Sequence, residues 1–241
     1  MTLPNEPSLQ KLQFYVTTAY PCGYLSDRQA QSLVAAPQQL VDATVYSELI
    51  RQGFRRSGKF TYRPHCQGCN ACVPVRLQVA GLTHNRSQRR AWKQHATLSV
   101  RILELHESYE HYSLYRDYQK ARHPKGGMDD DNIGQYRSFL AESNVDTLMV
   151  EFREGEQLRM VSIVDCVADG LSAVYTFYDC SDPKMAYGTF NVLWLAAWCR
   201  QLNLPYLYLG YWIAESQKMA YKTNFSPLEG LQDDVWKLFE K

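Results

Sequence analysis

Residues 171–210 read LSAVYTFYDCSDPKMAYGTFNVLWLAAWCRQLNLPYLYLG, and this stretch decides the fold. Its first part is rich in β-branched and aromatic residues and predicts a strand over 171–179. The apolar run at 188–203 predicts a long helix, and PYLYLG at 205–210 predicts a buried strand. A strand, a long apolar helix and another strand in succession indicate an α/β domain.

The segments on either side of this stretch extend the same organisation. They predict a strand at 97–105, helices at 107–123 and 132–142, strands at 147–153 and 158–168, a short helix at 214–222 and a last strand at 235–239. The resulting order, β-α-α-β-β-β-α-β-α-β, resembles the acyltransferase fold of the GCN5-related N-acetyltransferases. We therefore expect an α/β (α+β) fold in which residues 101–241 form an acyltransferase-like domain around a mixed sheet.

The first half of the chain is less regular. The capping-box pattern SDRQ at 26–29 predicts a short helix that ends at Pro37, and a second helix is expected at 43–52. PVRLQV at 74–79 alternates like a half-buried strand, and 86–95 predicts a short basic helix. We expect a smaller, cysteine-containing N-terminal domain at 1–80 and a basic junction helix at 81–100.

Charge is segregated along the chain although the net charge is only +1. Residues 51–100 contain ten Lys or Arg and no Asp or Glu, so the remaining residues carry 16 basic and 25 acidic side chains. Such a segment favours a nucleic-acid partner, because phosphates attract clustered Arg and Lys. The alternative is a basic face that acidic segments of the same protein neutralise.

Two absences bear on localisation. No run approaches the roughly 18 apolar residues of a membrane span, and the N-terminus MTLPNEPSLQ lacks the features of a signal peptide. We therefore expect a cytoplasmic protein with no membrane partner. In that reducing compartment its seven cysteines are thiols or ligands rather than disulfides.

A cysteine-rich turn occurs in YRPHCQGCNACVPVRL at 62–77. Cys66, Cys69 and Cys72 are spaced i, i+3, i+6, and Cys22 or His65 is the candidate for a fourth ligand. Three readings remain open: a structural metal site, small thiols packed in a turn, and a redox or catalytic thiol.

Six motifs together identify a family resemblance: YPCGYLSDRQAQSL, GFRRSGKFTYRPHCQGCNACVPVRL, NRSQRRAWK, VYTFYD, GTFNVLW and YLYLGYWI with KMAYKTNFSPLE. They resemble the aminoacyl-tRNA–protein transferases, and more narrowly the bacterial aspartate/glutamate leucyltransferases, over about residues 12–230. The resemblance implies transfer of leucine from leucyl-tRNA to the α-amine of proteins that begin with Asp or Glu. The product enters the N-degron (N-end rule) route to proteolysis.

The resemblance also bears on cofactors and on the N-terminal domain, which it implies helps to hold substrate. Eukaryotic relatives are associated with an iron–sulfur cluster held by N-terminal cysteines, including a CxxC pair. In this chain Leu25 stands where the second thiol of that pair would be, three residues after Cys22. We expect no cofactor for the chemistry itself, with aminoacyl-tRNA as a co-substrate and a structural metal left open.

Aminoacyl-tRNA is an activated ester, so the reaction needs positioning and anion binding rather than a nucleophilic side chain. For tRNA we expect Arg86, Arg89, Arg90 and Lys93, which recur on one helix face, with a solvated face as the alternative. Free N–H groups at Gly188 and Thr189, where the long helix starts, suit a phosphate of the tRNA 3′ end. Lys218 and Lys222, four apart on one predicted helix face, point at RNA or at water; we count Lys218 among the tRNA contacts.

The acceptor needs a reader for its carboxylate and help with proton transfer. Arg56 and Arg76 are our candidates for the carboxylate, with structural salt bridges as the alternative. Tyr178, Asp179 and Tyr211 stand at predicted strand ends, where α/β sheets place their ligands, and are the candidates for catalysis.

Two rival functions remain at this point. An N-acetyltransferase that uses acetyl-CoA would need a Gly-rich phosphate loop before the long helix, and DCSDPKMAYGTF at 179–190 lacks one. A non-enzymatic RNA-binding module would leave the acyltransferase-like half of the chain unexplained.

Overall fold

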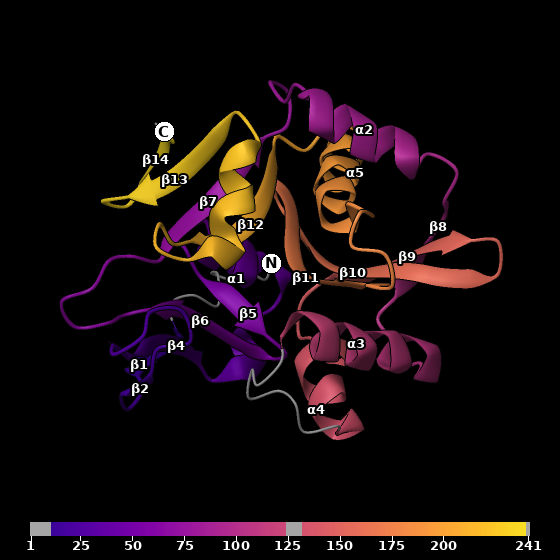
Figure 1. Ribbon diagram of the computed structural model, residues 1–241. Helices are drawn as coiled ribbons and strands as arrows, with labels where there is room; N and C mark the ends of the chain where they lie inside the picture. The colour runs from indigo at the N-terminus through magenta and orange to yellow at the C-terminus, as the bar shows by residue number, and fades with distance from the viewer. Residues whose placement is uncertain (1–10, 124–131, 240–241) are drawn as a thin grey trace, which may run out of the picture.

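The computed structural model describes residues 11–123 and 132–239 and is built around an eight-stranded mixed sheet (Figure 1). The strand order is β14-β13-β7-β12-β11-β10-β9-β8. All neighbours are antiparallel except β11 and β12, which are parallel. The strands are β7 (Val73–Gln78), β8 (Ser99–Glu104), β9 (Thr147–Glu154), β10 (Gln157–Val167), β11 (Gly170–Tyr178), β12 (Tyr206–Trp212), β13 (Leu228–Gln232) and β14 (Val235–Leu238).

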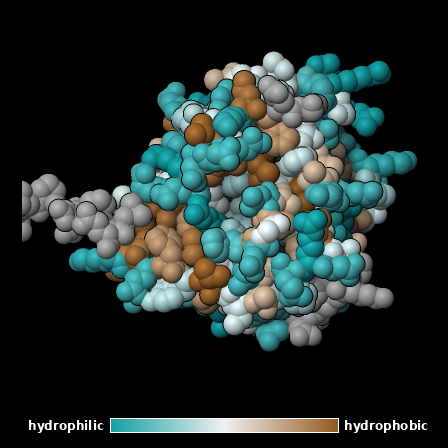
Figure 2. All heavy atoms as spheres, turned by 90° about the vertical axis from the view of Figure 1, so that its left-hand side faces the viewer, coloured by the Kyte–Doolittle hydropathy of each residue, from teal (hydrophilic) through white to brown (hydrophobic). Residues whose placement is uncertain are grey.

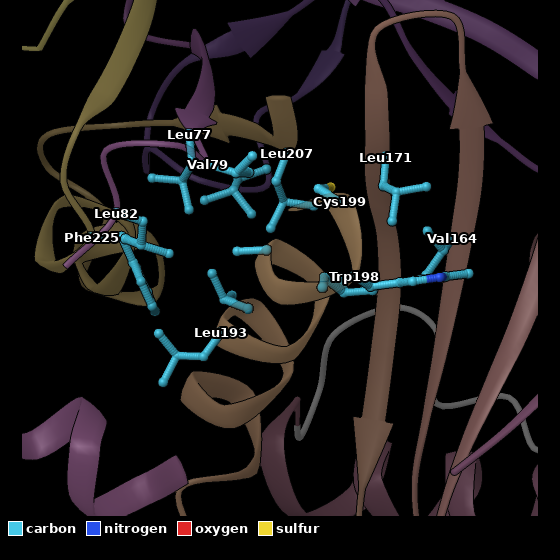
Figure 3. Close-up of a cluster of buried hydrophobic side chains, with 14 of the residues drawn as sticks. Leu77, Val79, Leu82, Val164, Leu171, Leu193, Trp198, Cys199, Leu207 and Phe225 are labelled. Atoms are coloured by element: carbon cyan, nitrogen blue, oxygen red, sulfur yellow. The ribbon is translucent and has the colours of Figure 1, made fainter. Parts of the chain in front are cut away.

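Helices cover both faces of this sheet (Figure 1). α5 (Tyr187–Gln201) and α2 (Arg86–Gln94) pack on one face; α1 (Ala43–Arg51), α3 (Tyr109–Arg122) and α4 (Ile133–Tyr136) pack on the other. Because neighbouring residues of a strand point to opposite faces, Leu207 of β12 packs against α5 on one face and Tyr208 packs against α1 on the other. Figure 3 shows Trp198 of α5 extending toward the strands that carry Val164 and Leu171, and Leu193 of the same helix belongs to the same core cluster. None of the described helices is both long and apolar enough to cross a bilayer.

A second, smaller sheet lies beside the first. Its order is β1-β4-β6-β5, and its strands are β1 (Gln13–Val16), β4 (Ser32–Ala36), β6 (Phe60–Pro64) and β5 (Arg55–Ser57). β2 (Tyr20–Pro21) and β3 (Gln29–Ala30) form a separate two-stranded ribbon. Figure 2 views the molecule from this side and shows patches of hydrophobic residues on a largely hydrophilic face. The small sheet contributes exposed Phe14, Val16 and Phe60.

The small sheet is joined to the large one through a shared core. Val45 and Leu49 of α1 pack with Val167 and Tyr208 of the large sheet. The chain changes sheets between β6, which ends at Pro64, and β7, which is already a strand of the large sheet. The change therefore occurs at the cysteine-rich turn, and the domain boundary at residue 80 stays a prediction.

Most predicted elements are confirmed to within a few residues, but one predicted helix is wrong and one strand of the large sheet was not predicted. The helix expected from residue 26 to Pro37 is wrong: 29–30 and 32–36 are strands, because Ser32–Ala36 pairs with both β1 and β6. The first strand of the hairpin β13–β14 was not predicted from the sequence, although the second was. Its two-residue turn is Asp233-Asp234, with φ of 52° and 58°, where a glycine would have signalled the turn more clearly.

Candidate active site at the opening between two central strands

The only parallel pair of described strands separates toward its C-terminal end. β11 and β12 are paired over 170–172 and 206–208, although β11 continues to Tyr178 and β12 to Trp212. We call this opening the β11–β12 gap. Backbone groups on strands that no longer pair need other partners, so the gap is a place where side chains or ligands insert.

Arg55 of β5 extends from the small sheet into the β11–β12 gap. Its guanidinium donates to the carbonyl oxygen of Val174 on β11 at 3.2 Å and lies 5.7 Å from the ring centre of Tyr211 on β12. Gly210 leaves the space for it: this residue has φ of +75°, and an added Cβ would overlap with the guanidinium. No ion pair among the described residues includes Arg55, which is half-buried. Its remaining donors are therefore available to a ligand.

Lys222 is a second basic side chain at the same gap, and it is buried. It lies in the 3₁₀ helix η4 (Gln217–Asn224), is 4% exposed, and donates from Nζ to the carbonyl oxygen of Tyr211. Burial, and then the charge of Arg55, hold the pKa of Lys222 well below its usual range. Within the described parts of the chain no carboxylate pairs with it. Burial therefore shifts Lys222 toward the neutral amine.

The geometry of η4 overturns the expectation that Lys218 and Lys222 share a helix face. A 3₁₀ helix has three residues per turn, so residues three apart are aligned and residues four apart are not. Met219 and Lys222 are accordingly buried, and Lys218 is exposed. Lys218 lies near His123 at the end of α3, where its charge adds to burial in lowering the pKa of that histidine.

Arg56 and Arg76, the two arginines expected to read a substrate carboxylate, already bind carboxylates of the protein. Arg56 donates to both oxygens of Asp165 at 2.6–2.9 Å, and the two side chains are 2% and 0% exposed. Arg76 donates to Glu229 at 2.6 Å, also in a buried position. Neighbouring residues of a strand point to opposite faces, so Arg56 enters the core while Arg55 faces the gap. The geometry thus favours Arg55 as the guanidinium free for a ligand.

Tyr178 and Tyr211 lie on the two strands that border the gap. Tyr178 is half-buried at the end of β11, next to Gly188 in the first turn of α5, and burial raises its pKa. Tyr211 is 3% exposed, and its hydroxyl donates to the carbonyl oxygen of Gly53 at 2.8 Å. Tyr178 is therefore placed beside the helix start, whereas the hydroxyl of Tyr211 is used in holding the small sheet.

Asp179, the third residue expected to assist catalysis, is held by two groups of the protein. Its carboxylate pairs with Arg159 at 2.5 Å and accepts from the amide of Ser181 at 2.9 Å. Burial would raise its pKa, but these hydrogen bonds outweigh burial and lower it. A carboxylate stabilised in its charged form is a weak proton acceptor at neutral pH.

α2 carries an apolar face and a basic face on opposite sides. Its face toward α5 includes the buried residues Gln88 and Ala91, followed by His95 at the C-cap. Four exposed residues make up what we call the α2 basic face: Arg86, Arg89, Arg90 and Lys93. None of the four forms an ion pair with another described residue. An open groove of about 500 Å³ lies at the helix start and is lined by Asn85, Arg86, Ser87 and Arg90.

The start of α5 also has unused donors. Its N-cap residue, Ala186, provides no side-chain cap, so the first-turn amides near Gly188 and Thr189 lack a side-chain acceptor. Because α2 packs on α5, the α2 basic face and this helix start belong to one layer of the molecule (Figure 1).

The four cysteines considered as ligands lie near one another but do not form a ligand set. Burial raises the pKa of Cys72 to about 11, with further increases from Cys66, Cys22 and Cys69. Cys69 instead has a lowered pKa, first through the amide of Ala71 and then through Arg28, whose guanidinium lies 3.4 Å from the sulfur. No three metal-binding side chains among the described residues converge on a common point. No catalytic step is assigned to a metal ion or cluster, and a structural metal stays an open prediction.

Arg55 and Lys222 were not among the site residues predicted from sequence. Arg55 occurs in the motif GFRRSGKF beside Arg56, and only the alternation of a strand distinguishes the two. Lys222 was assigned to the wrong helix type. The usable signal was Gly210 at the end of a buried strand, because glycine there indicates that another group approaches the backbone closely.

Two family models and one solved structure are similar to parts of this chain. Residues 20–90 match the family model "Arginine-tRNA-protein transferase, N terminus", and residues 110–232 match "Arginine-tRNA-protein transferase, C terminus". Among solved structures, a C-terminal domain of a lysylphosphatidylglycerol synthetase from Agrobacterium fabrum has a TM-score of 0.43 at 7% identity, covering 59% of this chain and 47% of that one. That level of likeness carries no argument about activity.

Three proteins named aspartate/glutamate leucyltransferase are similar over nearly the full chain. The protein from Methylobacillus flagellatus is 63% identical over 98% of this chain and 96% of its own length. Those from Thiobacillus denitrificans and Nitrosospira multiformis are 53% and 52% identical, over 98% and 100% of this chain and 99% and 96% of their own. The chain therefore belongs to the arginine-tRNA–protein transferase family, an enzyme family of aminoacyltransferases, and within it to the bacterial aspartate/glutamate leucyltransferase branch.

Proposed function

We propose that this enzyme transfers leucine from leucyl-tRNA to the α-amine of polypeptides that begin with Asp or Glu, and that the transfer takes place at the β11–β12 gap. The relatives at 63% and 53% identity carry this activity in their name. The single observation that supports the site is Arg55, a half-buried guanidinium in the gap that has no carboxylate partner among the described residues.

The acceptor binds through its first side chain. A guanidinium presents planar, paired N–H donors that match a carboxylate, so the free donors of Arg55 suit the side chain of Asp or Glu. Tyr24 and Tyr62 lie near enough to Arg55 to interact electrostatically with its charge. An acceptor that begins with Ala leaves the guanidinium without a partner and is a poor substrate.

The tRNA binds along the α2 basic face. Its phosphates meet four exposed cations and the groove at the start of α2, and Lys218, exposed on the helix η4 that also carries Lys222, adds a further cation. The uncapped amides at Gly188 and Thr189 receive a phosphate close to the 3′ end, which brings the leucyl ester to Tyr178.

The chemistry follows from the substrates. The ester carbonyl is already activated, so attack by a neutral amine needs orientation and proton removal rather than a covalent intermediate or a cofactor. The product carries an N-terminal leucine, which marks it for the N-degron route. Because charged tRNA is a cytoplasmic substrate, we assign the reaction to the cytoplasm.

Radiolabelled leucyl-tRNA, incubated with peptides that differ only in their first residue, tests this proposal. We expect label on peptides that begin with Asp or Glu and little on those with Asn or Ala. Arg55→Met removes a charge-assisted pair worth roughly 2–4 kcal/mol and lowers kcat/KM for the Asp peptide about 30- to 1000-fold. Arg51→Met, a partly exposed arginine of α1, is the matched control and leaves kcat/KM within a few-fold.

Two results would refute separate parts of the proposal. Equal labelling of the Asp and Ala peptides by the wild-type enzyme removes the carboxylate reader. An absence of label from leucyl-tRNA with any peptide removes the activity itself.

A further inference from the structure

Lys222 is a buried amine whose positive charge has no structural role in the fold. It is 4% exposed, and its only hydrogen bond among the described residues is the one that Nζ donates to the Tyr211 carbonyl oxygen. Burying an ammonium group without a counter-charge is costly, and an apolar side chain of the same length would fill the site equally well. The amine therefore requires a reason beyond packing.

The groups that face Lys222 come from three elements. Arg55 projects from β5 and repels a proton on Nζ, Tyr211 on β12 supplies the carbonyl oxygen, and the ring of Tyr221 on η4 lies 5.9 Å away. No carboxylate faces it from the portions of the chain described. A neutral amine that donates one hydrogen to Tyr211 keeps its lone pair for a proton from elsewhere.

We propose that Lys222 is the general base that removes a proton from the α-ammonium group of the acceptor, an inference that rests on the proposed function. Arg55 and Lys222 face consecutive residues of β12, Gly210 and Tyr211. Between the α-nitrogen and the carbon of the side-chain carboxylate there are two carbons in an N-terminal Asp and three in an N-terminal Glu. A carboxylate held on Arg55 therefore brings the α-amine within reach of Lys222.

The step balances without any further reactant. Nζ takes one proton from the α-ammonium group, and the neutral amine attacks the carbonyl carbon of the leucyl ester. As the C–N bond forms and the bond from that carbon to the ribose oxygen breaks, the proton on Lys222 passes to the departing oxygen. The second proton lost by the nitrogen goes to solvent, and Lys222 returns to the neutral state.

The test compares Lys222→Met, Lys222→Ala and Lys222→Arg with Lys237→Met, which removes an exposed lysine of β14. Single-turnover transfer from leucyl-tRNA to an Asp peptide is followed across pH. We expect Lys222→Met to lose at least about 100-fold in rate with little change in tRNA affinity. Lys237→Met keeps the wild-type single-turnover rate. Methylamine added to Lys222→Ala restores rate in proportion to its free-base form.

A role in binding charge predicts a different pattern. Recovery of the rate in Lys222→Arg, or a loss in Lys222→Ala that methylamine does not repair in a folded protein, would overturn the assignment. An unchanged rate in Lys222→Met would do so as well. The wild-type enzyme adds a check that needs no variant, because its kcat/KM must fall at acidic pH as the base becomes protonated. If wild-type enzyme transfers no leucine to Asp peptides, the proposed function fails instead.

Discussion

Replacing Arg56 is expected to lower the stability of the protein, whereas replacing its neighbour Arg55 is expected to lower its activity. Arg56 makes five hydrogen bonds, of which three go to Asp165, and neither side chain of the pair is more than 2% exposed. Arg56→Met leaves Asp165 as a buried carboxylate with only the hydroxyl of Thr147 as a side-chain donor. Breaking such a pair costs roughly 3–5 kcal/mol. At about 2–4 °C per kcal/mol for a chain of this size, Tm falls by roughly 6–20 °C.

Arg55→Met behaves differently, because Arg55 makes a single hydrogen bond within the described parts of the chain, to the Val174 carbonyl. Its loss costs about 1 kcal/mol of stability, while transfer to Asp peptides falls as described above. Thermal and urea unfolding followed by circular dichroism, together with the peptide assay, separates the two effects.

The double variant Arg56→Leu with Asp165→Leu is the control for the stability argument. Removing both charges leaves no uncompensated carboxylate, so it should be more stable than Arg56→Met alone. The reasoning is refuted if Arg56→Met unfolds like the wild type yet no longer labels Asp peptides. In that case Arg56 is the carboxylate reader and its bond to Asp165 is exchanged for the substrate.

Three further outcomes follow from the same geometry. Gly210→Ala places a methyl group where the Arg55 guanidinium lies, so kcat/KM for Asp peptides should fall with little change in tRNA affinity. Neutralising the three arginines of the α2 basic face should weaken leucyl-tRNA binding and reduce the slope of log affinity against log salt by about 2, without lowering Tm. Iodoacetamide at pH 8 should alkylate Cys69 before Cys72, because the pKa of Cys69 is lowered and that of Cys72 is raised to about 11; mass spectrometry of peptides reads the order.

Much of the large sheet could be predicted from the sequence because its elements are long and strongly periodic. α5 and the strands on either side of it are identified by apolar runs that no loop would carry. The small sheet could not be predicted equally well. β4 has the composition of either a short helix or a strand, and its pairing with β1 and β6, which are distant in sequence, decides between them.

The charge pattern of the basic segment, residues 51–100, does not show which of its cations are paired within the protein. Four of its cations pair with acids that lie beyond residue 140: Arg51 with Asp169, Arg56 with Asp165, Lys59 with Glu142 and Arg76 with Glu229. For these four, neutralisation by the same protein is the correct interpretation. Arg55 and the α2 basic face are not paired among the described residues, and for the latter the nucleic-acid interpretation stays a prediction. In the sequence the paired and the unpaired cations look alike, because the acidic residues that pair with the first group lie in distant elements of the chain.

Arg55 and Lys222 together imply that recognition of the acceptor and its activation are coupled. The charge of Arg55 is one of the two causes that lower the pKa of Lys222, after burial. An acceptor carboxylate on Arg55 compensates that charge, so the pKa of Lys222 rises and the lysine becomes a stronger base when an acidic residue is bound. An acceptor without the carboxylate leaves Lys222 weakly basic even when it occupies the gap. The enzyme then discriminates against acceptors without a carboxylate through a slower rate of transfer as well as through weaker binding. A pocket that only bound the carboxylate would produce the difference in affinity but not the difference in rate.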